Sequence, residues 1–173
     1  MIPEKLHLYW GKSKPLSWLR WMTVKSFADL NPDWEIIIWT SKELSERSSW
    51  KTKEFSYDSK IRKNWFNQLE NIGKNVIVQE TDIVDFLPTD VHRADLLRWH
   101  LLHAVGGFWS DFDILYFRPM DELYINWEAD VLLCWGEIEE LRWWQAIGFL
   151  GGKPGNKLFA EMEQQARMIA RTS

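Results

Sequence analysis

Residues 94–113 read ADLLRWHLLHAVGGFWSDFD and contain, in succession, a helix, its stop signal and a strand. The apolar side chains at positions 94, 97, 101, 104 and 105 form one stripe on a helical wheel, which predicts a helix from after Pro88 to Val105. Gly106-Gly107 is typical of a left-handed helix C-terminus. Phe108-Trp109 then has the apolar character of a buried strand, so the segment reads as half of an α/β unit.

The same alternation extends in both directions along the chain. We expect a helix from Pro15 whose buried stripe carries Leu16, Leu19, Phe27 and Leu30, ended by the turn at 31–33. Further helices are expected at residues 58–71 and 158–169, and strands at 6–10, 34–39, 75–79, 114–117, 130–135 and 146–150. This order predicts an α/β fold in which one domain, residues 1–173, has a central, mostly parallel sheet flanked by helices. Ligands of such sheets bind outside the carboxyl ends of the strands.

Composition narrows the classes of partner. The formal net charge of −4 lacks the excess of positive charge that phosphate-backbone binding requires, so nucleic acid is not an expected partner. A single cysteine, Cys134, excludes a disulfide framework and a thiolate metal cluster. No apolar run has the length of a membrane span and no signal peptide is recognisable at the start, so we expect a cytoplasmic protein. The 13 tryptophans fit either ligand stacking or an aromatic core.

Asp111-Phe112-Asp113 follows the predicted strand and carries the strongest chemical signal. Side chains two apart in an extended chain share one side, so both carboxylates face the same way while Phe112 enters the core. Two close carboxylates repel each other unless a cation lies between them, and a hard divalent cation with oxygen ligands could also hold a diphosphate. A solvated acidic turn is the alternative. A calcium-binding loop lacks its glycine here, and Leu115 stands where an aspartyl-phosphate hydrolase needs a small hydroxyl or β-branched side chain.

Three further residues occupy positions that favour either a structural or a binding role. Arg98 falls inside the apolar stripe of its helix and Asp95 lies at the edge of that stripe, where unpaired charges are costly. The two are three residues apart and could form a structural ion pair, or Arg98 could meet phosphate while Asp95 accepts from sugar hydroxyls. Trp10 ends the first strand just before Gly11, at the edge where a nucleobase could stack, although a core position fits as well.

Together these segments resemble the DXD-containing glycosyltransferases of the type shared by capsular-polysaccharide transferases, fungal mannosyl-initiating transferases and the large glucosylating toxins. The resemblance covers residues 2 to about 120. It rests on four segments in order, IPEKLHLYWG at 2–11, NPDWE at 31–35, ADLLR at 94–98 running on to GGFW at 106–109, and DFD at 111–113. Each segment alone is weak evidence for the resemblance, whereas the four in this order are specific to the family.

The resemblance implies a GT-A fold and a Mn²⁺ or Mg²⁺ ion that bridges the DXD motif and the diphosphate of a nucleotide-sugar donor, with a UDP-sugar favoured. It implies that Trp10 stacks on the base, that Asp95 holds hydroxyls of the donor sugar and that Arg98 stabilises the donor. Asp111 would contact the ribose and metal-bound water, and Asp113 would ligate the metal. The implied reaction moves a hexose, with retention, to a glycan or other hydroxyl acceptor, as in polysaccharide biosynthesis.

The C-terminal region departs from the resemblance. Relatives often carry a histidine in a PGHPF-like segment that could contact the metal or the diphosphate, and residues 154–159 read PGNKLF with Asn156 in its place. The sequence also ends soon afterwards, where relatives usually continue into acceptor-binding elements. The alternative is therefore a non-catalytic or degenerate module that binds a nucleotide-sugar.

Overall fold

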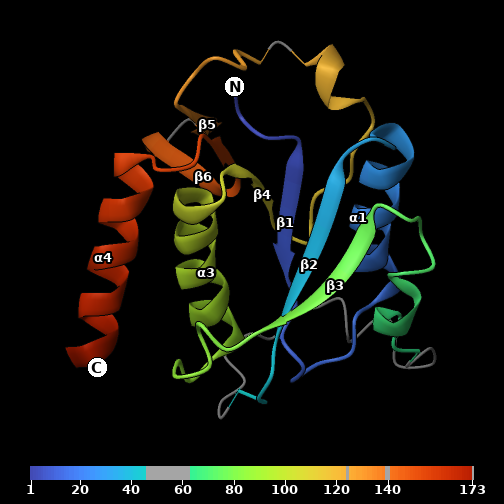
Figure 1. Ribbon diagram of the computed structural model, residues 1–173, viewed down its shortest axis with the longest axis horizontal. Helices are drawn as coiled ribbons and strands as arrows, with labels where there is room; N and C mark the ends of the chain where they lie inside the picture. The colour runs from blue at the N-terminus through green and yellow to red at the C-terminus, as the bar shows by residue number, and fades with distance from the viewer. Residues whose placement is uncertain (46–62, 124, 139–140, 173) are drawn as a thin grey trace.

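The computed structural model describes residues 1–45, 63–123, 125–138 and 141–172. Within them a six-stranded sheet has the order β3-β2-β1-β4-β6-β5 and three α-helices cover it (Figure 1). The strands are β1 Lys5–Tyr9, β2 Glu35–Ser41, β3 Val76–Thr81, β4 Gly107–Ser110, β5 Val131–Ile138 and β6 Leu141–Gly152. The helices are α1 Trp18–Leu30, α3 Asp90–Ala104 and α4 Lys157–Thr172, with short 3-10 helices η1 Phe66–Gln68 and η2 Met120–Glu122.

The sheet is mostly parallel, as predicted. β1 pairs in parallel with β2 on one side and with β4 on the other, and β2 pairs in parallel with β3. β6 runs antiparallel to both β4 and β5. The chain builds outward from β1 to β2 and β3, then returns through α3 to place β4 on the opposite side of β1. The strand order therefore reverses between β1 and β4, which is where open α/β sheets bind their ligands.

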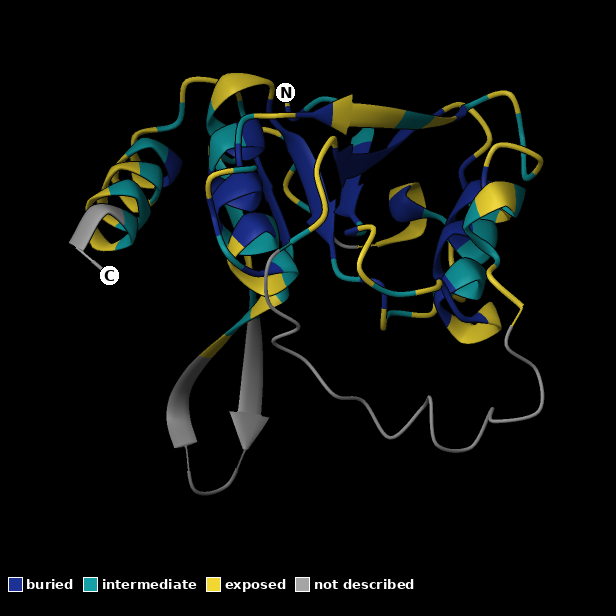
Figure 2. Cartoon of the chain, turned by 90° about the horizontal axis from the view of Figure 1, so that it is seen from below, coloured by how far each residue is buried: buried dark blue, intermediate teal, exposed yellow. Residues whose placement is uncertain are grey.

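The two faces of the sheet carry separate cores. Leu6 and Leu8 of β1 pack in the cluster that includes Phe27 of α1, whereas Tyr9 packs in the cluster that includes Leu97 of α3. This alternation follows from the two-residue period of a strand. The second cluster also contains Phe159 of α4, whose ring stacks on Trp99 of α3 at 6.0 Å between centroids. α1 thus covers one face, and α3 and α4 cover the other (Figures 1 and 2).

Local signals at the ends of α3 agree with the structure. Thr89 caps the N-terminus by accepting a hydrogen bond from the His92 N–H, and Gly106 has φ of 72° at the C-terminus. A side-chain link then ties this end to β1, because the ring of buried His7 lies 3.0 Å from the carbonyl oxygen of Gly106. α3 is therefore held to the centre of the sheet at the point where β4 begins.

The helix expected at residues 58–71 does not form where the structure describes it. Positions 58–62 lie outside the described residues, and the rest contains only η1 followed by turns. The reason is that this segment bonds to the stretch before α1: the Asn64 side chain accepts from the Leu16 N–H, and the Trp65 N–H donates to the Leu16 carbonyl oxygen. These bonds tie Asn64 and Trp65 to the stretch before α1, and the short 3-10 helix η1 follows them.

The strand expected at residues 114–117 is also wrong. These residues have no sheet partner, and the Tyr116 N–H donates to the Ser26 hydroxyl on α1. Leu115 and Phe117 point outward and are 48% and 80% exposed. β6, which is longer than expected, takes the place beside β4 that residues 114–117 would have needed.

The buried face of α1 differs from the expected stripe. The helix begins at Trp18 after the N-cap Ser17, so Leu16 is buried but lies outside it, and Leu19 is 60% exposed. The inward face instead includes Arg20 and Thr23. The expectation failed because apolar periodicity gives no weight to a polar residue that turns toward a site.

Within the described ranges, no helix is long and apolar enough to cross a membrane.

Candidate functional site

One pocket of about 420 Å³ opens where the strand order reverses. Its walls come from the residues at and after the end of β1, from Arg20 of α1, from the first half of α3, from the residues at and after the end of β4, and from β6. All five residues that the sequence singled out line it, namely Trp10, Asp95, Arg98, Asp111 and Asp113. Residues up to 103 positions apart along the chain thus share one cavity.

Trp10 forms the wall at the end of β1. Its indole N–H donates to the Lys14 carbonyl oxygen at 3.0 Å, which fixes the ring over the following turn. The ring meets Phe112 nearly edge-on, with 5.4 Å between centroids and 70° between planes. On α1, the guanidinium carbon of Arg20 lies 5.4 Å from the centroid of the Trp10 ring. Trp10 is half-buried, so it serves the packing of the site and also faces the cavity.

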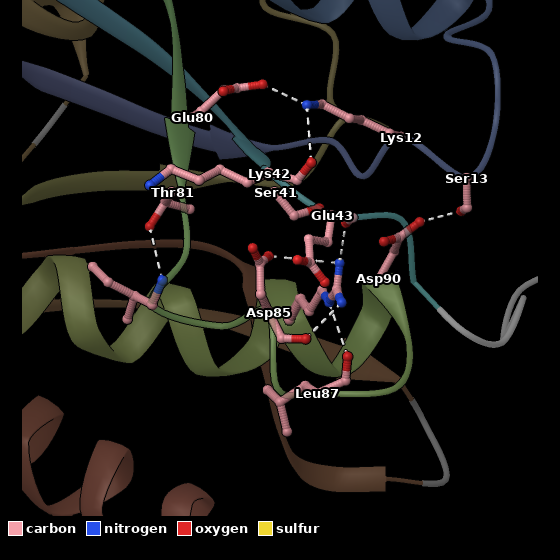
Figure 3. A network of polar contacts seen from close by, with 12 residues as sticks. Lys12, Ser13, Ser41, Lys42, Glu43, Glu80, Thr81, Asp85, Leu87 and Asp90 are labelled. Carbon is pink, nitrogen blue, oxygen red and sulfur yellow. Dashed lines mark hydrogen bonds and ion pairs between the residues drawn. The ribbon is translucent and has the colours of Figure 1, made fainter.

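Two side-chain contacts hold the turn after β1 in place (Figure 3). Lys12 pairs with Glu80 on β3, and the Ser13 hydroxyl donates to Asp90 at the start of α3. Gly11 leaves room for the Asp90 carboxylate, which a Cβ at this position would displace. The turn is therefore positioned against the end of α3 that bears the charged residues of the pocket.

Arg98 reaches the pocket from α3 and connects three groups. One of its terminal nitrogens, Nη1, donates to the Ile147 carbonyl oxygen at 2.8 Å. The other, Nη2, lies 3.1 Å from Asp95 Oδ1 and 3.4 Å from Asp111 Oδ1. The Arg98 side chain is 3% exposed, so it orients both carboxylates from within the protein. The ion pair with Asp95 forms, and both of its residues line the pocket.

Asp111 lies directly after β4 and is held from several directions. Its N–H donates to the Gly148 carbonyl oxygen at 2.7 Å, and its Oδ1 accepts from the Trp109 indole N–H at 2.8 Å. A Cβ on Gly148 would come within 3.2 Å of Asp111 Oδ2, so the glycine leaves room for that oxygen. Burial raises the pKa of Asp111, and the positive charge of Arg98 opposes this rise.

Asp95 and Asp113 differ in their surroundings. Burial also raises the pKa of Asp95, with Arg98 again the main opposing group. Asp113 is exposed at the pocket margin, and buried Phe112 between the two aspartates points into the core as expected. The Thr23 hydroxyl on α1 donates to the Phe112 carbonyl oxygen at 2.8 Å, which holds the Asp111–Asp113 loop in place.

The donor set suits a hard cation only in part. Asp111 and Asp113 supply carboxylate oxygens, which Mg²⁺ and Mn²⁺ prefer. No group of three or more acidic, histidine or cysteine side chains that could hold a metal occurs within the described part of the chain. The remaining coordination positions would therefore fall to water and a bound diphosphate, which is how Mg²⁺ is often held with nucleotides. Asn156 contributes nothing to the pocket lining and is used structurally, since its side chain donates to the Asp130 carbonyl oxygen and accepts from the Leu158 N–H.

Among the charged residues that line the pocket, sequence reasoning missed Lys14, Arg20 and Asp90. Asp90 could have been suspected from its place in the first turn of a helix next to the predicted site. Arg20 had no comparable signal, because its role depends on how α1 lies across the sheet.

Comparisons with known proteins agree with this arrangement. Residues 20–130 match the family described as the glycosyltransferase sugar-binding region containing DXD motif. The chain is 28% identical over 123 residues to inositol phosphoceramide mannosyltransferase 3 of Schizosaccharomyces pombe, covering 70% of this chain and 27% of that protein. It is 31% identical over 126 residues to subversion of eukaryotic traffic protein A of Legionella pneumophila, covering 71% of this chain and 19% of that protein. The chain thus corresponds to about a quarter and a fifth of these two relatives.

A solved structure supports the fold. The PaToxG glycosyltransferase superposes with a TM-score of 0.67 over 98% of this chain and 61% of that one, at 14% sequence identity. The likeness confirms a glycosyltransferase fold, as the sequence predicted. Since the family match spans more than half of the residues and includes both the Asp95–Arg98 helix and the Asp111–Asp113 loop, the chain belongs to the family of glycosyltransferases with a DXD-containing sugar-binding region.

Proposed function

We propose that the protein is a metal-dependent glycosyltransferase that moves a hexose from a nucleotide-sugar, with a UDP-sugar favoured, to a glycan or other hydroxyl acceptor with retention. The observation that carries this proposal is the convergence of Trp10, Asp95, Arg98, Asp111 and Asp113 on one pocket at the reversal of strand order. Family membership supports the same conclusion.

Different pocket residues are suited to different parts of the donor. Trp10 offers an aromatic surface for the base at the β1 end of the pocket. Asp95 is 43% exposed and oriented by Arg98, so its free oxygen can accept hydrogen bonds from sugar hydroxyls. Arg98 supplies positive charge beneath the two carboxylates that it holds. Each role uses a group whose orientation is fixed before the donor arrives, which lowers the entropic cost of binding.

Asp113 and Asp111 are the residues that would hold a Mn²⁺ or Mg²⁺ ion. Such an ion, when bound, would neutralise the diphosphate and stabilise it as a leaving group. Asp113 is exposed and can ligate directly. Asp111 is already bonded through Oδ1 to Trp109 and Arg98, so Oδ2 is its oxygen for further contacts.

A nucleotide-sugar-binding module without transfer activity is the alternative, favoured by Asn156. Asn156 stands at the position of the family histidine, and its side chain forms hydrogen bonds with the Asp130 carbonyl oxygen and the Leu158 N–H near the start of α4. Metal-dependent hydrolysis of the donor by the purified protein distinguishes the two, because an active transferase that lacks its acceptor can pass the sugar to water whereas a binding module yields no product.

The donor is identified by a thermal-shift screen of UDP-, GDP- and other nucleotide-sugars with and without Mn²⁺. Mannose-bearing donors belong in the screen because the fungal relative is named as a mannosyltransferase. We expect one nucleotide-sugar to raise the unfolding temperature only when Mn²⁺ is present. A protein that no nucleotide-sugar stabilises under any condition would contradict both candidate functions.

A further inference from the structure

Acidic side chains outnumber basic ones around the pocket. Among the described lining residues, the acidic ones are Asp90, Asp95, Asp111 and Asp113, and the basic ones are Lys14, Arg20 and Arg98. A nucleoside diphosphate adds further negative charge. The positive charge of Arg98 is already shared between two carboxylates, and its terminal nitrogens donate to them and to the Ile147 carbonyl oxygen. Arg98 is therefore better suited to orient the aspartates than to neutralise a phosphate alone.

Arg20 approaches the same pocket from the other side of the sheet. It belongs to α1, whereas Arg98 belongs to α3, and these helices cover opposite faces (Figure 2). Arg20 is 7% exposed yet lines the cavity, and its guanidinium lies over the Trp10 ring. A cation held in this way keeps its planar fork in a defined orientation.

The position of Arg20 relative to the Asp111–Asp113 loop follows from its helix. Residues three apart on a helix are neighbours on its surface, and Thr23 is three residues after Arg20. Thr23 donates to the Phe112 carbonyl oxygen, in the middle of the loop that bears both aspartates. This face of α1 therefore contacts the ring expected to stack on the base through Arg20 and the loop expected to hold the metal through Thr23. A diphosphate that runs from the base to the metal would pass along it.

We propose that Arg20 binds the diphosphate of the nucleotide-sugar donor. A guanidinium matches phosphate oxygens with two parallel hydrogen bonds, and these charge-assisted bonds are stronger than neutral ones. Arg20 and the metal would then neutralise the diphosphate from two directions, while Arg98 holds Asp95 and Asp111. This inference rests on the proposed function and adds to it a donor-binding residue on α1.

The test measures binding of UDP, uridine and pyrophosphate with Mn²⁺ to wild-type protein and to three variants. Uridine lacks the phosphates and pyrophosphate lacks the base, so the two ligands report on the base and the diphosphate separately. If the donor screen selects a guanine nucleotide, GDP and guanosine replace UDP and uridine. We expect Arg20→Met to weaken UDP and pyrophosphate by about 10- to 100-fold, the range for a hydrogen bond to a charged group, and to leave uridine unchanged. Arg20→Lys keeps the charge without the fork and should lose less. Lys25→Met, which removes a positive charge from the same helix outside the pocket, should bind as wild type.

Two results would overturn the inference. One is an unchanged affinity of Arg20→Met for UDP and pyrophosphate. The other is an equal loss for uridine and UDP, which would mean that Arg20 only supports the Trp10 ring. Circular dichroism establishes that each variant is folded; if Arg20→Met is not, the comparison of uridine with UDP in Arg20→Lys decides in the same way. Wild-type protein that binds none of these phosphates with Mn²⁺ contradicts the proposed function and this inference together, whereas normal wild-type binding with an unaffected variant removes Arg20 alone.

Discussion

Single side chains in this pocket do more than one task. Arg98 is a buried cation whose two acidic partners, Asp95 and Asp111, both remain open to the cavity. The same contacts stabilise the buried guanidinium and fix the orientation of the two carboxylates that face the cavity, so a structural role and the proposed binding role can coexist. Substitutions at these residues must be judged on stability and on binding separately.

Asp113 provides the sharpest test of the metal. The Asp113→Asn variant loses a charged ligand that is exposed and not needed for packing, so we expect normal stability and a fall in activity of about 100-fold or more. Calorimetry should show that UDP binds wild type more tightly with Mn²⁺ than with EDTA and that the variant shows no such difference. Asp121→Asn, at an exposed position outside the pocket, is the matched control. Equal UDP affinity of the wild type with Mn²⁺ and with EDTA would count decisively against metal-dependent binding.

We expect substitutions of Arg98 and of Asp95 to affect the binding of different ligands. Arg98→Met removes the group that orients Asp111 as well as Asp95, so we expect weaker binding of UDP itself and a stability loss of about 3 kcal/mol. Asp95→Asn keeps the shape of the side chain and should spare UDP while weakening only the intact nucleotide-sugar. Binding curves for both ligands, together with urea unfolding, measure the two effects. A double variant with apolar residues at both positions and wild-type donor affinity would show that the pair is purely structural.

At the scale of elements, the site depends on how closely β4 approaches its neighbour. Gly107 starts β4 with φ of 100°, and a Cβ there would lie 2.7 Å from the Lys5 carbonyl oxygen on β1. Neither strand can move away without breaking the pairing that places Trp10 beside Asp111. The glycine pair after α3 is therefore needed both to end the helix and to let β4 reach β1.

A pair of glycine substitutions separates these effects. Gly107→Ala combines a left-handed φ with a backbone collision, and we expect a loss of about 3 kcal/mol in the free energy of unfolding. Gly155→Ala has a φ of 75° but nothing within 4 Å of the added Cβ, so only the conformational cost of about 1 kcal/mol remains. Chemical denaturation of the two variants checks the difference. Equal losses would mean that the approach of β4 to β1 is not tight.

At the scale of the whole molecule, His7 connects the central strand β1 with β2 and with the C-terminal end of α3. It is fully buried in β1, and the Trp39 indole N–H donates to its Nδ1 at 3.2 Å. Its Nε2 then carries the proton that is donated to the Gly106 carbonyl oxygen, so the ring is neutral. Burial lowers the pKa of His7 from 6.5 to about 4.

Stability should consequently decline in mild acid. Between pH 6.5 and about 4 the unfolded chain binds a proton at His7 that the folded protein does not, so the stabilisation is complete above pH 6.5 and is lost as the pH falls through this window. The loss approaches about 3 kcal/mol, the equivalent of the shift in pKa. Urea unfolding at pH 7 and pH 4.5 measures it. His7→Gln retains an N–H donor without titrating, and an unchanged pH dependence in that variant would place the effect elsewhere.

Local sequence determined much of this protein. The order of most strands and helices, the stop at Gly106-Gly107 and the inward position of Phe112 follow from periodicity, capping and backbone preference, which act over a few residues and are visible in the chain itself. The ends of β1 and β4 could be located in the same way. Because parallel strands present their carboxyl ends at one edge, the meeting of Trp10 with Asp111 and Asp113 followed from their positions.

Only the tertiary structure decided which segment pairs with β4 and which groups the pocket arginines contact, because the partners of these residues are distant in sequence. Asn64 and Trp65 bond to Leu16, distant in sequence, where a longer helix was expected, and β6 fills the place beside β4 that residues 114–117 were expected to take. Arg98 divides its donors among Asp95, Asp111 and the Ile147 carbonyl oxygen only once β6 is in place. In the sequence, Arg20 is one polar residue among others on a helix. In the structure it lies over Trp10, because the packing of α1 on the sheet turns that face of the helix toward the pocket.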